Sequence, residues 1–179
     1  MASVRKASTY SKKTTRPFTR ISKNRTKAYI KTVPNNKIAK YSQGSAADFK
    51  AGKHPYLISL KANEKVQIRD LALEACRMFV TKMMESQASG QFFLSMHAYP
   101  HHLLRENKLS AGAGADRLST GMTQSYGIIV GRAALVKPGQ TIMFISCANE
   151  KAARIARDSL KKIKSKVPCS ATVSFEKIA

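Results

Sequence analysis

Positively charged side chains recur through the first 47 residues, where no Asp or Glu balances them. Lysine and arginine at this density neutralise phosphate groups, and the aromatic rings interleaved with them can stack on bases. The segment is therefore expected to bind nucleic acid, to be disordered when free and to become ordered on its partner. A solubilising tail is the alternative. The basic residues are Arg5, Lys6, Lys12, Lys13, Arg16, Arg20, Lys23, Arg25, Lys27, Lys31, Lys37 and Lys40, and the rings are Tyr10, Phe18, Tyr29 and Tyr41.

A second set of cations follows one face of a helix expected between Asn149 and Pro168. The apolar residues of this segment fall within about 80° of arc on a helical wheel, and the cations lie opposite them. Only Glu150 and Asp158 relieve the positive charge, so contact with phosphates is favoured over a merely solvated face. The apolar residues are Ala152, Ala156, Leu160, Ile163 and Val167, and the cations are Lys151, Arg154, Arg157, Lys161 and Lys164.

Residues 105–123, RENKLSAGAGADRLSTGMT, form the third candidate site. Glycines and small residues disfavour both helix and strand, which predicts a mobile loop. Loops of this length are usually functional or disordered, and the basic residues suit contact with phosphates; an ordinary flexible connector is the alternative. The glycines lack the Gly-Lys-Ser/Thr that a nucleoside-triphosphate loop requires. The glycines are Gly112, Gly114 and Gly121, and the basic residues are Arg105, Lys108 and Arg117.

Catalytic chemistry has weaker candidates. Asp116 and Arg117, with His102, could serve an RNA-processing or nuclease-like enzyme, but no cluster of acids is visible to hold a metal ion. His101 and His102 are adjacent, so in a strand they point to opposite faces and cannot chelate one ion together. Contact with RNA or surface exposure is expected for both. We therefore expect no enzyme activity, no catalytic residue, no cofactor and no metal.

Composition limits the remaining classes of protein. The 179 residues carry a formal charge of +22, which favours a polyanionic partner, and their apolar fraction of 43% is enough for a core. No apolar run is long enough to span a membrane and no secretory signal is apparent; an organelle transit peptide and a basic peripheral membrane protein are minor alternatives. Cys76, Cys147 and Cys169 are odd in number and far apart, which indicates a reduced intracellular protein without disulfides.

The elements that must position these residues are two helices and about six short strands, mostly linked as hairpins. This pattern predicts an α+β fold, a two-layer sandwich of a mostly antiparallel sheet with two helices. Residues 1–53 would form the basic arm and residues 54–179 the globular domain. The strands are expected at 56–60, 91–99, 126–136, 141–147 and 171–175, with a hairpin turning at 137–140, and the helices at 63–86 and 149–167.

The first helix is expected to begin at Asn63, a plausible N-cap, with Glu64 in its first turn. Its apolar stripe is read as core, with Cys76 as a small buried residue on it. The stripe comprises Leu71, Ala75, Met78 and Phe79, broadened by Ala72, Cys76, Val80 and Met83.

The run from Tyr99 to Gly127, YPHHLLRENKLSAGAGADRLSTGMTQSYG, closely resembles the archaeal and eukaryotic large-subunit ribosomal protein ten-e family, the counterpart of bacterial large-subunit protein sixteen. The resemblance extends over about residues 16 to 178. The chain departs from the family at Ile128-Ile129, where Lys-Pro is usual. The matching motifs are Arg105 to Lys108, Ala113 to Arg117, Gly121-Met122 and Tyr126-Gly127.

This resemblance implies a hammerhead-like α+β fold with an extended, rRNA-embedded basic arm, in the large ribosomal subunit of the cytoplasm. It implies large-subunit rRNA and neighbouring ribosomal proteins as partners, with no membrane. The loop from Lys108 to Met122 would reach toward the peptidyl-transferase centre and tRNA acceptor ends, and late subunit-maturation factors are further expected partners. The residues implied at that loop are Arg105, Lys108, Gly112, Gly114, Asp116, Arg117, Gly121 and Met122.

Overall fold

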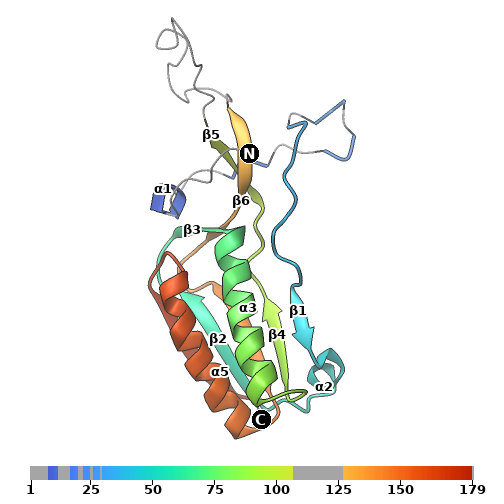
Figure 1. The fold of residues 1–179 in the computed structure, drawn as a ribbon, viewed down its shortest axis with the longest axis vertical. Helices are drawn as coiled ribbons and strands as arrows, with labels where there is room; N and C mark the ends of the chain where they lie inside the picture. The colour runs from blue at the N-terminus through green and yellow to red at the C-terminus, as the bar shows by residue number, and fades with distance from the viewer. Residues whose placement is uncertain are drawn as a thin grey trace, which may run out of the picture.

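Two antiparallel sheets organise the chain in the computed structural model, which describes residues 8–11, 17–19, 22–24, 26–28, 30–106 and 127–178 (Figure 1). The larger sheet has the order β1-β4-β7-β2-β8 and the smaller one the order β3-β6-β5. All pairings are antiparallel, so the predicted α+β class with a mostly antiparallel sheet is confirmed. The larger sheet contains β1 (Ser42–Gly44), β4 (Phe92–Met96), β7 (Thr141–Cys147), β2 (Tyr56–Ala62) and β8 (Ala171–Lys177); the smaller contains β3 (Val66–Arg69), β6 (Ile128–Val136) and β5 (His102–Glu106).

Two long helices, α3 (Asp70–Gln87) and α5 (Glu150–Ile163), lie side by side against one face of the larger sheet (Figure 1). A 3-10 turn at Lys164–Lys166 extends α5. Two shorter helices, α1 (Ser8–Ser11) and α2 (Ala46–Lys50), belong to the N-terminal part of the chain. Among the described residues, no helix has both the length and the apolar character needed to cross a membrane.

The main core lies between these helices and the sheet. Alternation along β2 directs Ile58 and Leu60 toward the helices, and Ile145 of β7 is the direct neighbour of Ile58. From the helix side, Leu73 and Leu160 complete the layer, and all five side chains are fully buried. Burial of apolar surface on this scale stabilises the domain and fixes the orientation of the exposed face of α5.

The first long helix begins later than the sequence predicted. Val66–Arg69 is strand β3, which pairs with β6, and α3 starts only at Asp70. The expectation of a helix from Asn63 was wrong because Val66 and Ile68, which suit a strand, find a partner strand across the fold. Asn63 and Glu64 instead bond to the chain around β8: Thr172 Oγ1 donates to Asn63 Oδ1 at 2.9 Å, and the Ser170 N–H donates to Glu64 Oε1 at 3.3 Å.

The buried face of α3 also differs from the expected stripe. Leu71 and Met78 are 45% and 58% exposed, and Ala75 is exposed as well, so these residues lie on the outer side. Cys76 and Val80 are buried as predicted, and Phe79 is partly buried. The helix has apolar residues on several sides, and its packing against α5 and the sheet selects one of them. The residues that face the core are Leu73, Cys76, Val80 and Met84.

The predicted hairpin of 126–136 with 141–147 does not form, because β6 and β7 belong to different sheets. The turn between them exists, with Gly139 at a φ of 79°, and it carries the chain from the smaller sheet to the larger. It binds the end of β2: the Gly139 N–H donates to the Ala62 carbonyl at 2.7 Å, and the Ala62 N–H donates to the Gln140 carbonyl at 3.0 Å. Periodicity located both strands but could not show which strands pair.

Described parts of the N-terminal segment contact both sheets. Tyr10 packs with Leu104 and Ala133 on the smaller sheet, and Ile38 belongs to the main core. Tyr10 and Ile38 are therefore buried in two different apolar clusters of the protein. The segment 1–53 as a separate arm, and its disorder when free, stay predictions.

Candidate nucleic-acid interface

Helix α5 places its cations on solvent and its apolar residues on the core, as the sequence predicted. Ala152, Ala156, Leu160, Ile163 and Val167 are all buried. The four predicted cations nearest the start of the helix are exposed and the fifth is partly exposed. In chain order they are Lys151, Arg154, Arg157, Lys161 and Lys164.

The positive charge of this face is only partly compensated. Arg154 pairs with Glu150 at 2.7 Å and Lys161 with Asp158 at 3.8 Å. All four side chains are more than half exposed, so water and salt screen both pairs and the pairs add little to stability. A phosphate approaching the helix would therefore meet a surface that stays cationic.

The predicted basic residues of the N-terminal segment divide into two sets. Lys23, Lys27, Lys31, Lys37 and Lys40 are described and exposed. The Lys31 ammonium donates to the Thr26 carbonyl at 3.4 Å. The remaining predicted positions, Arg5, Lys6, Lys12, Lys13, Arg16, Arg20 and Arg25, lie outside the described residues.

Of the predicted loop residues, only Arg105 is described, at the end of β5. The other seven, Lys108, Gly112, Gly114, Asp116, Arg117, Gly121 and Met122, lie outside the described residues. Gly127 and Arg105 flank this segment, and the structure places a pocket between them.

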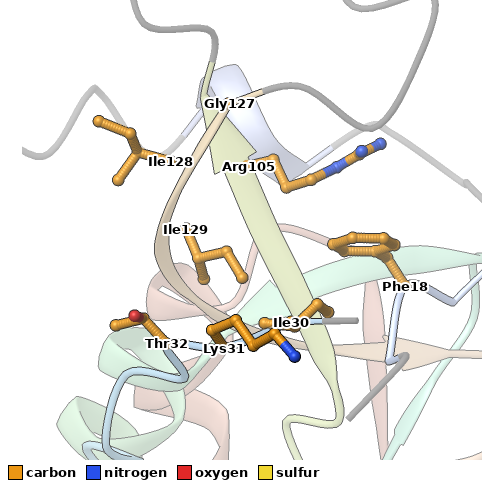
Figure 2. Close-up of a pocket in the computed structure, with 8 residues that line it drawn as sticks. All are labelled: Phe18, Ile30, Lys31, Thr32, Arg105, Gly127, Ile128 and Ile129. Atoms are coloured by element: carbon orange, nitrogen blue, oxygen red, sulfur yellow. The ribbon is translucent and has the colours of Figure 1, made fainter. Parts of the chain in front are cut away.

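This pocket has a volume of about 360 Å³ and opens beside the ends of β5 and β6 (Figure 2). Figure 2 shows two isoleucines of β6 on one side and Arg105 with Phe18 on the other. Arg105 and Ile129 are direct cross-strand neighbours, so their side chains share one face of the smaller sheet. The lining residues are Phe18, Ile30, Lys31, Thr32, Arg105, Gly127, Ile128 and Ile129.

Backbone hydrogen bonds fix Phe18 in the pocket wall. The Phe18 N–H donates to His102 Nδ1 at 2.9 Å, and the Leu103 N–H donates to the Phe18 carbonyl at 3.0 Å. The Arg105 guanidinium carbon lies 4.2 Å from the centre of the Phe18 ring, which is a cation–π contact. The pair therefore forms a positively charged wall of the pocket.

A second stretch of the N-terminal segment closes the pocket floor. Arg132 Nε donates to the Pro34 carbonyl at 2.7 Å and holds this stretch beside β6. Ile30, four residues earlier, is buried, while Lys31 and Thr32 are exposed at the rim. The pocket thus combines an apolar floor with cations on its edge.

His102 has a structural task that the sequence did not reveal. It is buried, and burial is the main cause that lowers its pKa below the ordinary value; the nearby charges of His101 and Arg105 act in the same direction. The neutral ring accepts the Phe18 N–H at Nδ1. The expectation of RNA contact or exposure was wrong for His102, since its neighbours enclose it, while His101 is partly exposed.

The described residues give little basis for cysteine reactivity or for metal binding. Burial raises the pKa of Cys76 to about 11 and that of Cys147 to about 12, so both stay protonated thiols at neutral pH. The three cysteines are free. Across residues 30–106, 127–178 and the shorter described stretches, no group of three or more His, Cys, Asp or Glu side chains could hold a metal ion.

Sequence reasoning missed the joining of Phe18 and Arg105, which are far apart in the chain. Each residue type was noted, one as an interleaved ring and the other as a loop cation, but nothing in their spacing links them. The bonds to His102 and Leu103 that bring them together depend on the tertiary fold.

Comparison with known proteins gives a consistent result. A family model described as ribosomal protein L16p/L10e matches residues 16–174. A protein of Archaeoglobus fulgidus named large ribosomal subunit protein uL16 is 38% identical over 164 residues, covering 90% of this chain and 87% of that protein. The protein of the same name from Staphylothermus marinus is 39% identical over 161 residues, covering 89% of this chain and 86% of that protein. The one from Hyperthermus butylicus is 40% identical over 153 residues, covering 85% of this chain and 79% of that protein.

Proposed function

Because the chain belongs to the L16p/L10e family of ribosomal proteins, we propose that it is a structural constituent of the large ribosomal subunit in the cytoplasm. Its partners are large-subunit rRNA and neighbouring ribosomal proteins, and its role in translation is binding rather than catalysis. Membership of this family confirms the resemblance carried by residues 99–127. The single observation in the fold that best supports RNA binding is the exposed cationic face of α5, opposite a buried face that is apolar except for Ser159.

The mechanism follows from charge. The cations of α5 and of the N-terminal segment neutralise rRNA phosphates and release condensed counterions, which drives association. Phosphate contacts of this kind fix the position of a protein on RNA without reading sequence. We infer that the segment 1–53 is the extended basic arm of a two-layer, hammerhead-like sandwich and that its cations lie against rRNA phosphates.

The segment 105–123 is proposed to extend toward the peptidyl-transferase centre and the acceptor ends of tRNA. The flanking position of Arg105 beside a positively charged pocket supports this proposal. Late subunit-maturation factors are further proposed partners of the same loop. The chemistry of peptide transfer would belong to the RNA, and Lys108 and Arg117 would position its substrates.

Sucrose-gradient fractionation of cells that express a tagged copy of this chain tests the subunit assignment. We expect migration with the large subunit and polysomes, retained after a moderate salt wash. Presence in the light fractions alone would reject the proposal.

The loop needs a separate test. Lys108→Ala with Arg117→Ala should leave incorporation intact but reduce translation or final maturation. Normal polysomes in that variant would reject the proposed role of the loop while leaving the subunit assignment in place.

A further inference from the structure

The pocket beside β5 and β6 has the size and wall chemistry of a nucleotide site. Its volume of about 360 Å³ exceeds that of one base and leaves room for part of a sugar. One side is the flat Arg105–Phe18 pair, and the facing side is aliphatic, at Ile128 and Ile129. Unpaired bases in protein–RNA complexes stack on aromatic rings and on arginine planes, which this pair combines.

Contacts within the protein hold the walls of the pocket in place. Phe18 is fixed by two hydrogen bonds to β5, and the strand pairing with β6 fixes Arg105 opposite Ile129. Since the guanidinium already lies on the ring, little side-chain freedom is lost when a base stacks on the outer surface of the pair. Preformed walls of this kind distinguish a binding site from an accidental surface hollow.

The charge of the rim selects the kind of occupant. Arg105 and Lys31 are both cations, and none of the described residues that line the pocket is acidic. An apolar peptide side chain would gain nothing from them, whereas a nucleotide can present its phosphate to Lys31 and its base to the Arg105–Phe18 pair. The hydroxyl of Thr32, exposed at the rim, can bond to a base edge or a ribose hydroxyl.

We propose that this pocket binds one unstacked nucleotide of the large-subunit rRNA, with its base against the Arg105–Phe18 pair and its phosphate beside Lys31. The proposal rests on the assignment of the chain to the large subunit and adds a defined contact to it. Phosphate contacts along α5 anchor the protein to RNA, and the pocket binds a single base. The ends of β5 and β6, which flank the segment 107–126, are thereby fixed on the RNA at one point.

Chemical probing of assembled subunits tests the proposal. Large subunits carrying the full-length chain are purified on gradients and treated with a reagent that acylates flexible ribose 2′-hydroxyls and with one that methylates unpaired bases. Removal of one stacking partner costs about 1–3 kcal/mol, or roughly 5- to 150-fold in the equilibrium constant for seating the base, since 1.36 kcal/mol is tenfold, and the unbound, reactive fraction rises accordingly. Phe18→Leu and Arg105→Gln should each raise the reactivity of the same nucleotide at least fivefold.

Two further variants guard against loss of the local fold. Ile129 is partly buried and is the cross-strand neighbour of Arg105, so Ile129→Trp places an indole on the face of the smaller sheet that carries Arg105, and it should expose that same nucleotide by displacing its base. Lys31→Gln removes an exposed charge together with its hydrogen bond to the Thr26 carbonyl, and it should increase the reactivity at that site more weakly. Lys137→Gln, an exposed lysine in the turn after β6, is the matched control and should change nothing there.

The outcomes separate this proposal from the subunit assignment. Failure of the unmodified chain to enter large subunits would reject the assignment itself. If the variants enter normally and no nucleotide gains reactivity, or if Phe18→Leu and Ile129→Trp expose different nucleotides, the pocket does not hold a base and the assignment still stands.

Discussion

Neutralising two cations of α5 should weaken RNA binding by an amount that the structure allows us to work out. Lys151 and Arg157 are exposed, and neither forms an ion pair with any described residue, so each can contribute a full phosphate contact. Each contact adds about 0.7 to 0.9 to the slope of log Kobs against log salt concentration. Lys151→Gln with Arg157→Gln should therefore flatten that slope by about 1.4 to 1.8. Relative to 1 M salt, where this contribution vanishes, binding at 0.1 M should fall by about 25- to 60-fold.

The assay is filter binding of the full-length chain to large-subunit rRNA over a series of KCl concentrations at fixed Mg²⁺. Glutamine keeps good helix propensity, so the far-UV circular dichroism of the double variant should match that of the unmodified chain. The same loss of two charges at Lys65 and Lys137, which are exposed outside α5, is the control and should leave the slope unchanged. An unchanged slope in the α5 variant, or an equal change in the control, would refute the reasoning that α5 faces phosphates.

Three further predictions concern stability, measured as the urea midpoint of the full-length chain. Leu160→Ala should lower the free energy of unfolding by about 2–5 kcal/mol, because the side chain is fully buried between α5 and the sheet; a loss below about 1 kcal/mol would contradict that packing. Gly44→Ala should cost about 1–3 kcal/mol, since Gly44 has a φ of 92° and a Cβ there would lie 2.1 Å from the Phe92 carbonyl oxygen; an unchanged midpoint would mean that β1 does not pair as described. The depressed pKa of His102 makes its contribution complete above about pH 6.5, and this contribution is lost as the pH falls through the lowered pKa, because the unfolded ring takes up a proton first. His102→Asn keeps an acceptor for the Phe18 N–H and should reduce the loss of stability between pH 7.5 and 5.5; an identical loss in both proteins would exclude His102 as its source.

The sequence predicted α5 well and α3 poorly for a physical reason. In α5 the apolar residues occupy one narrow arc, so only one face can be buried, and the structure buries that face. In α3 the apolar residues surround much of the helix, and Leu71 and Met78 competed with Leu73 and Met84 for the core. Packing against α5 decides between these faces, and that information is absent from the local pattern.

The sequence predicted the positions of the strands more reliably than it predicted which strands pair with one another. The alternation that predicts a strand at 141–147 depends on side chains of β7 alone, whereas pairing depends on which edges meet in space. The turn at 137–140 has the residues of a hairpin turn, yet it connects two sheets. The candidate site divides in the same way: the cations of α5 follow from spacing, and the wall made by Phe18 and Arg105 follows only from the fold.

The position of β2 in the larger sheet has a consequence for how the protein is made. This strand lies between β7 (Thr141–Cys147) and β8 (Ala171–Lys177), both of which come much later in the chain. During synthesis β2 therefore emerges well before either neighbour, and its ladder of backbone groups has no strand partner until those strands are made. Pairings between such distant parts of a chain form slowly, so the open edges of β2 are a site where the nascent chain can aggregate.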